Sequence, residues 1–272
     1  MMRSLWTAAS GMISQQKNVD TISNNLANVN TYGYKKERME FKTLMYDTME
    51  RANLDPANPP GRPANLQIGL GVRPVVTSRV FTQGNIERTD HPLDLTINGD
   101  GFFMIENAPD SVAYTKDGAI KVSPIDEGIM LTTSEGYPIL SSEGERIILP
   151  REVMAEDIGV SQEGALSYMD TSGAYADLGM SVGLAQFPNV QGLEAIGSNL
   201  FVATSASGEA IVEAPGDVNR LSAIMQGTLE MSNVQVATEM VDLIVAQRAY
   251  ELNSKAIQTS DEMLQQANNL KR

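Results

Sequence analysis

The sequence predicts an α+β protein: long N- and C-terminal helices that pair as a coiled coil, and a mostly antiparallel, sandwich- or barrel-like β domain between them. Three observations predict this fold class. Apolar residues repeat every seven positions at both ends of the chain. Glycine-containing turn signals recur about every 8–10 residues in the middle. With 272 residues, of which 42% are hydrophobic, the chain can bury a core.

The N-terminal helix is expected over residues 4–29, a stretch without proline. At 1.5 Å per residue such a helix would be about 39 Å long. One apolar row recurs every seven residues, and a second row follows it three residues later. The two rows are Leu5, Met12, Val19 and Leu26, then Ala8, Gln15, Ile22 and Val29. Asn28, Asn30 and Gly33 supply the residues that end the helix.

The C-terminal helix is expected to start at residues 232–235, which have the S-x-x-Q form of a capping box. No proline or glycine follows through Arg272. Its apolar row is Val236, Leu243, Tyr250, Ile257 and Leu264, and the stripe is widened by Ala249, Ala256, Met263 and Leu270. A helix of this length needs another helix to cover its stripe. The two terminal helices are therefore expected to pair in a domain of residues 1–33 plus 229–272.

Between the helices, residues 34–80 are expected to form an extended connector and residues 81–228 a β-rich outer domain. Prolines crowd the stretch 47–66, which excludes a regular helix or a central strand there. The Asn-Gly and Asp-Gly pairs at 98–101 separate two apolar runs, a signal for a β-hairpin. A returning β segment is expected over 200–227.

Composition argues against an enzyme. The chain has no cysteine and a single histidine, and it contains no metalloprotease, P-loop or nucleophile-elbow motif. We therefore expect no catalytic residue, cofactor or metal ligand. The net charge of −14 argues against nucleic acid and anionic lipid as partners. No apolar run is long enough to insert directly in a membrane, and the first residues do not have the pattern of a cleavable signal peptide.

Several separated motifs resemble those of the bacterial flagellar rod and hook family. They are SNNLAN at 23–28, TYGYK at 31–35, QGNIE at 83–87, LDLTINGDGFF at 93–103, YTKDG at 114–118, SNV at 232–234 and IVAQRAY at 244–250. The positions that carry the match are Asn24, Asn25, Leu26, Asn28, Gly33, Asn98, Gly99, Gly101, Phe102, Phe103, Gln247, Arg248 and Tyr250. The opening residues 2–11 and the GLGVRP segment at 69–74 are most similar to the distal rod branch. The resemblance is weak over 141–226.

The resemblance implies a structural subunit of the flagellar distal rod. Such a subunit polymerises into a tubular driveshaft that transmits motor torque to the hook and encloses the export channel. It also implies that the terminal helices line the inner tube. The implied partners are copies of the chain itself, proximal rod proteins, the hook protein, ring (bushing) proteins and the flagellar type III export apparatus. The implied location is the basal body in the periplasmic space of the cell envelope, reached without a cleavable signal.

Three other functions stay open from the sequence. A hook or proximal rod subunit is the nearest alternative. An acidic β-sandwich binding module that oligomerises through coiled coils belongs to a different class, and a hydrolase built on a β fold is the third.

Overall fold

The computed structural model describes residues 2–52, 64–108, 111–126, 128–151, 153–169, 175–213 and 222–269. The chain divides into two compact units. The helical unit comprises Met1–Ala27, Glu37–Ser78 and Gln235–Arg272. The β unit comprises Asn28–Lys36 and Arg79–Val234. Each unit is therefore assembled from segments that are far apart in the sequence.

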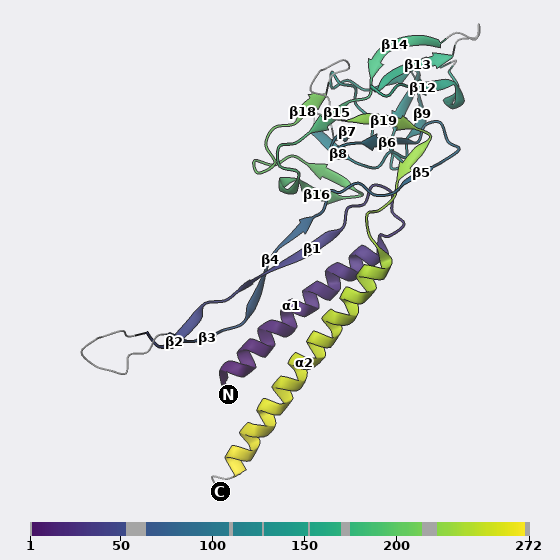
Figure 1. Ribbon diagram of the computed structural model, residues 1–272. Coiled ribbons are helices and arrows are strands. Elements are labelled where there is room, and N and C mark those ends of the chain that lie inside the picture. Colours follow the sequence, from purple (N-terminus) through teal and green to yellow (C-terminus); the bar gives the residue numbers. More distant parts are fainter. Residues whose placement is uncertain are drawn as a thin grey trace. The chain divides into compact units, whose positions relative to one another are not determined.

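Two helices and a ribbon of four strands make up the helical unit (Figure 1). The helices are α1 (Met2–Ala27) and α2 (Val236–Asn269), which lie side by side and antiparallel. The strands are β1 (Glu37–Thr43), β2 (Tyr46–Glu50), β3 (Leu66–Gly69) and β4 (Val72–Arg79). β1 pairs with β4 and β2 with β3, so residues predicted as an extended connector instead form a paired β ribbon. Most of the proline-rich stretch at 47–66 lies outside the described residues.

Both predicted helices exist, but their ends differ from the expectation. α1 ends at Ala27, so Val29 lies in the turn that follows rather than on the helix. α2 begins at Val236, and the residues of the proposed capping box lie before it. The Ser232 hydroxyl accepts a hydrogen bond from the Val234 amide at 3.3 Å. Ser232 therefore stabilises a turn and does not cap the helix. Leu270 lies outside the described residues.

Antiparallel sheets build the β unit. Its largest sheet has six strands in the order β16-β17-β8-β7-β15-β18. Two three-stranded sheets, β11-β10-β9 and β12-β13-β14, and the pairs β19-β6 and β20-β5 complete it. The strands are β5 (Ile86–Arg88), β6 (Leu95–Asn98), β7 (Phe102–Ala108), β8 (Ser111–Thr115), β9 (Lys121–Ile125), β10 (Gly128–Thr132), β11 (Ile148–Leu149), β12 (Ile158–Val160), β13 (Ala165–Met169), β14 (Tyr175–Ser181), β15 (Leu184–Gln186), β16 (Glu194–Gly197), β17 (Leu200–Val202), β18 (Ile211–Glu213), β19 (Ala223–Gln226) and β20 (Thr228–Glu230).

The hairpin expected at 98–101 does not form. The turn is present and Gly99 has a φ of 131°, but the strands on its two sides belong to different sheets. β6 pairs with β19, whereas β7 pairs with β8 and β15. The Gly101 amide donates to the Ser222 hydroxyl at 2.9 Å, which fixes the turn to the last part of the returning segment instead. Within 200–227 the described strands are β17, β18 and β19, as the returning β segment predicts.

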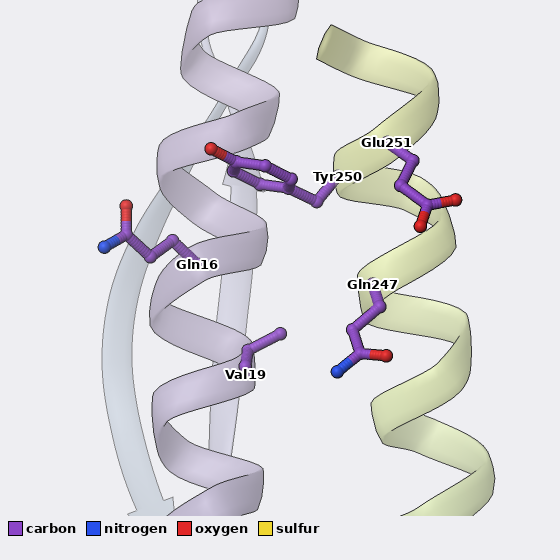
Figure 2. A pocket seen from close by; sticks show the side chains of 5 residues that line it. All are labelled: Gln16, Val19, Gln247, Tyr250 and Glu251. Carbon is purple, nitrogen blue, oxygen red and sulfur yellow. The ribbon is translucent and has the colours of Figure 1, made fainter.

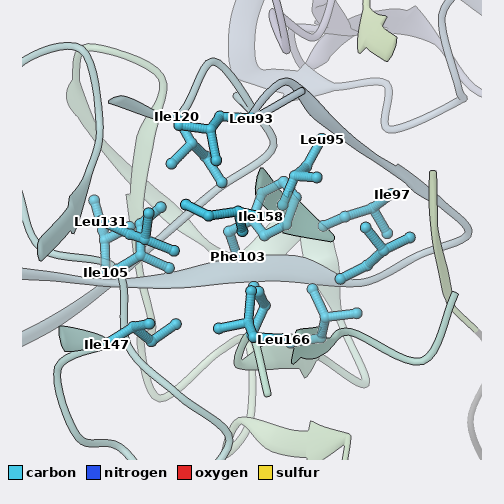
Figure 3. Packing of buried hydrophobic residues seen from close by; sticks show 14 of the residues in the cluster. Leu93, Leu95, Ile97, Phe103, Ile105, Ile120, Leu131, Ile147, Ile158 and Leu166 are labelled. Carbon is cyan, nitrogen blue, oxygen red and sulfur yellow. The ribbon is translucent and has the colours of Figure 1, made fainter. Parts of the chain in front are cut away.

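The core of the β unit is aliphatic and lies between its sheets (Figure 3). Leu95, Ile97, Phe103 and Ile105 come from β6 and β7, the two strands that flank the Asn-Gly turn, and all four are buried. Strands that are buried on both faces read as continuous apolar runs, as residues 102–105 of β7 do. A second cluster packs Phe102 against Phe187 and Phe201 in edge-to-face contacts.

The α+β class and the antiparallel sheets are confirmed. Among the described strands no sheet closes on itself, because the six-stranded sheet ends at β16 and β18, so a barrel is not confirmed. Within the residues described, neither helix is long and apolar enough to cross a membrane.

Candidate assembly surface

Small and polar side chains form a line of close contacts between α1 and α2, beside the predicted apolar rows. Its members repeat every seven residues on α2 and at multiples of seven on α1. The contacting pairs are Ser4 with Ser260, Gly11 with Asn253, and Asn25 with Glu239. A Cβ at Gly11 would lie 2.8 Å from the Asn253 amide nitrogen, so a larger residue there would require the Asn253 side chain to shift. We call this line of contacts the polar seam.

Asn25 closes the polar seam where α1 ends. Its side-chain amide is buried and both accepts a hydrogen bond from the Glu37 backbone N–H at 2.9 Å and donates to the Glu37 carbonyl at 2.8 Å. It also donates to a carboxylate oxygen of the buried Glu239 on α2 at 3.0 Å. One motif residue thus joins the end of α1, the start of β1 and the first turn of α2.

The predicted apolar stripes lie beside the polar seam. On α1, Ile22 is buried, and a further set is half-buried: Leu5, Met12, Val19 and Leu26. On α2, Leu243, Ile257 and Leu264 are half-buried, whereas Val236 and Tyr250 are exposed. The expected rows are therefore partly buried in the helix pair, and Val236 and Tyr250 are their most exposed described members.

A second apolar surface covers the side of α2 that faces away from α1. Its side chains are 47–68% exposed. They are Met240, Val241, Ile244, Val245, Leu252 and Met263. At 100° per residue, Met240, Val241 and Ile244 lie about 120–180° from Asn253 of the polar seam, and the other three lie about 80–100° from it. The set therefore extends from one flank of α2 to its far side. We call this set the outer strip.

Between the two helices lies a groove of about 410 Å³, mostly apolar in its lining (Figure 2). Gln16 and Val19 of α1 and Gln247, Tyr250 and Glu251 of α2 line it. In Figure 2 the Tyr250 ring extends from α2 toward α1, and Val19 points toward α2. The motif residues Gln247 and Tyr250 thus lie at this groove. Arg248 next to them pairs with Glu251 at 2.8 Å.

The β ribbon rests on α1 where glycine permits a close approach. Gly71 has a φ of 119°, and a Cβ there would overlap the Ser10 hydroxyl oxygen. That hydroxyl accepts a hydrogen bond from the Val72 amide at 3.3 Å. The ribbon nevertheless leaves many apolar side chains exposed: Phe41, Met45, Tyr46, Met49, Leu66, Ile68, Leu70, Val75 and Val76. Two-stranded ribbons are marginally stable alone, which indicates that this one requires a covering partner.

In the β unit, the N-terminal and C-terminal motifs meet at a buried ion pair. The Lys35 ammonium lies 2.6 Å from a Glu230 carboxylate oxygen, and both side chains are almost fully buried. Lys35 also donates to the Thr82 carbonyl at 2.9 Å, and the same Glu230 oxygen accepts from the Gly84 amide at 2.7 Å. Sequence reasoning missed Lys35 and Glu230 as partners, although both lie in or beside the quoted motifs.

Asn233 completes this cluster from the SNV motif. Its side-chain oxygen accepts from the Lys36 amide at 2.8 Å, and its nitrogen donates to the Val80 carbonyl at 2.7 Å. Asn233 thereby links its own segment to the backbone at Lys36 and Val80, which belong to two other stretches of the β unit. Gly33, with a φ of 67°, donates its amide to the Glu230 carbonyl at 2.9 Å, and a Cβ there would crowd the backbone of Asp117.

The turn motif of the β unit holds a second buried cation. Lys116 donates to the Gly99 carbonyl at 2.8 Å and lies 5.2 Å from the centre of the Phe102 ring. Burial, with a smaller contribution from the positive charge of Lys35, lowers the pKa of Lys116 from 10.5 to about 8. The Asn98–Phe103 motif therefore serves packing.

This depressed pKa has a definite consequence for stability. Below about pH 8 the Lys116 ammonium is charged in both the folded and the unfolded chain, and the folded state bears the cost of its burial. Between about pH 8 and 10.5 the unfolded chain binds more protons than the folded one. Stability therefore rises with pH across this window, by up to about 3 kcal/mol.

The remaining motif positions have no catalytic arrangement around them. Asn24 is exposed on α1, Asn28 lies in the turn after it, and Asn98 ends β6. Within the described part of the chain, no three side chains of histidine, aspartate or glutamate gather as they would around a metal ion. The polar seam, the groove and the outer strip are contact surfaces. The outer strip was not predicted from the sequence and is the largest feature that sequence reasoning missed. The spacing of Val241, Val245 and Leu252 could have indicated it.

Three family models match the chain. "Flagella basal body rod protein" matches residues 5–35, "Flagellar hook protein FlgE/F/G D1 domain" residues 96–168, and "Flagellar basal body rod FlgEFG protein C-terminal" residues 225–270. The first covers most of α1, the third contains α2, and the second includes most of the 93–103 motif and all of the 114–118 motif. The matches therefore fall on both units.

Relatives that align over their full length indicate the same family as these models. The flagellar basal-body rod protein FlgG of Borreliella burgdorferi is 50% identical and the alignment covers all of both chains. The protein of the same name from Bacillus subtilis is 39% identical with the same coverage. The flagellar hook-basal body complex protein FlhP of Bacillus subtilis is 33% identical, covering 97% of each chain. This chain belongs to the flagellar basal-body rod family, as a structural subunit of the flagellum and not an enzyme.

Proposed function

We propose that this subunit polymerises into the distal rod, the tubular driveshaft that carries motor torque to the hook and encloses the export channel. The observation that carries the proposal is the outer strip of α2. Within the described chain its side chains stay 47–68% exposed, whereas α1 contacts a different side of the helix through the polar seam. In the proposed rod, α1 and α2 pair as a coiled coil in the inner tube, and the β unit lies outside.

The energetics favour association of several chains. Full burial of one large aliphatic side chain contributes about 1.5–3 kcal/mol. The outer strip has six such side chains, each roughly half to two-thirds exposed. Even partial burial against a neighbour would offset much of the entropy lost on association. Where the contacting patches of two copies differ, the contact does not close and generates a helical filament.

The β ribbon is proposed to pack on neighbouring subunits and to stiffen the rod. Its exposed apolar side chains support this role, and they lie on both sides of the proline-rich stretch at 47–66. A rod with this stretch deleted should bend more easily, which electron micrographs of assembled filaments would show as greater curvature. A deleted chain that forms equally straight and stiff filaments would refute this role.

The partners follow from the relatives. The match to proteins named for the basal-body rod, the hook and the hook-basal body complex supports neighbours of those kinds. We propose proximal rod proteins and the hook protein as axial neighbours and ring proteins as a bushing. Export through the flagellar type III apparatus without a cleavable signal would bring the chain to the basal body in the periplasmic space. A hook or proximal rod subunit remains the alternative.

A single charge in the outer strip tests the central proposal. Val245→Glu should abolish filaments of the purified full-length chain, because the carboxylate would have to be buried against a neighbour. Gln162→Glu is the control, since it adds the same charge at an exposed position of the β unit, away from α2. Sedimentation and negative-stain electron microscopy measure the outcome. Normal filaments from Val245→Glu would contradict the proposal.

A further inference from the structure

The chain has one tryptophan, Trp6, and its side chain is 73% exposed on α1. Ile13, seven residues later, is 56% exposed on the same face of the helix. This is an unusual position for an indole, since its large apolar surface is normally covered. Neither residue belongs to the polar seam or to the outer strip. We call the two side chains the Trp6 ridge.

We propose that Trp6 of one subunit inserts into the groove between α1 and α2 of a second copy. That groove has a volume of about 410 Å³, within the range of pockets that enclose small ligands. Val19 and the Tyr250 ring supply apolar walls against which an indole can pack. The side-chain oxygens of Gln16, Gln247 and Glu251 are acceptors for the indole N–H, which is donor only.

A second copy fits better than another ligand because the two patches are complementary and separate. α1 carries two basic residues and one acidic residue, a net charge of +1. α2 carries two basic and five acidic residues, a net charge of −3. An α1 helix is therefore attracted to the α2 side of a groove in another copy.

The geometry of the contact would produce a filament rather than a closed pair. On α1 the Trp6 ridge and the groove-lining residues Gln16 and Val19 lie on different faces, roughly 100° apart. The contact is thus heterologous, and each chain can give one ridge and receive another. The groove lies ten to thirteen residues beyond Trp6 along α1, so parallel copies would be staggered by about 15–20 Å.

The inference rests on the proposed self-assembly. The fluorescence of the chain's single tryptophan tests it. Selectively excited tryptophan emission comes from Trp6 alone, so filament formation should shift this emission to shorter wavelength. It should also reduce quenching by acrylamide severalfold. An unchanged spectrum in filaments, with Val245→Glu still blocking assembly, would overturn the groove contact and leave the proposed function intact. A chain that stays monomeric at every concentration would overturn both.

Two variants test the contact, one on each side of it. Trp6→Ala removes the ridge, and Gln247→Phe fills the groove from within the same chain. Each should raise the critical concentration for filaments about tenfold or more, the effect of losing a buried aromatic anchor. Tyr175→Ala, which removes an exposed aromatic ring from the β unit, is the control and should have no such effect.

A conservative variant separates the shape of the ring from its N–H group. Trp6→Phe keeps an aromatic ring and should assemble better than Trp6→Ala. Each variant is first compared with the wild type by circular dichroism, where equal helix content is expected because Trp6 and Gln247 are exposed. Wild-type critical concentrations for Trp6→Ala and Gln247→Phe would refute the inference.

Discussion

Replacing Asn25 by alanine should destabilise the helical unit by roughly 3 kcal/mol. The buried side chain makes three hydrogen bonds, two to the Glu37 backbone and one to the Glu239 carboxylate. At about 1–1.5 kcal/mol each, their loss costs about 3–4 kcal/mol. Alanine recovers up to about 0.7 kcal/mol through its higher helix propensity. The net loss is large compared with the whole stability of a typical domain.

Urea unfolding followed by far-ultraviolet circular dichroism measures this loss, because both α-helices of the described chain belong to the helical unit. Asn24→Ala is the matched control. The two residues are adjacent and identical, but Asn24 is exposed, so its replacement should destabilise the helical unit less than that of Asn25. A loss below about 1 kcal/mol for Asn25→Ala, or equal losses for the two variants, would refute the assigned role of Asn25.

Three further predictions concern the β unit and are measured as free energies of unfolding. Lys35→Met should cost about 3–5 kcal/mol, because it leaves the buried Glu230 carboxylate without its cation; a neutral effect would contradict this. Gly84→Ala should cost about 1–3 kcal/mol, since the new Cβ would overlap the Met231 carbonyl oxygen. Lys116→Met should abolish the rise in stability between about pH 8 and 10.5, and a parallel pH profile in the variant would count against the buried cation.

The sequence predicted the class of the fold and the two helices because long seven-residue repeats are strong, local signals. α1 and α2 were predicted to within a few residues of their observed ends. The hairpin at 98–101 was wrong for a nonlocal reason. A Gly-containing turn indicates a reversal of the chain, but the pairing of β6 depends on β19, which lies more than 120 residues later.

The contact surfaces were harder to predict because α2 has two apolar sides. Periodicity favoured the row of Leu243, Tyr250 and Ile257, which flanks the helix pair. It could not show that Glu239, Ala246, Asn253 and Ser260 would face α1. Small side chains at a helix contact allow a close approach of the backbones, and this preference appears only when both helices are considered together.

A density map of filaments assembled from the full-length chain tests the central claim most directly. The proposed function predicts that Val241, Val245 and Leu252 of one subunit are covered by a neighbouring copy, and that the polar seam stays within each subunit. A map in which the outer strip of α2 faces only solvent would contradict it.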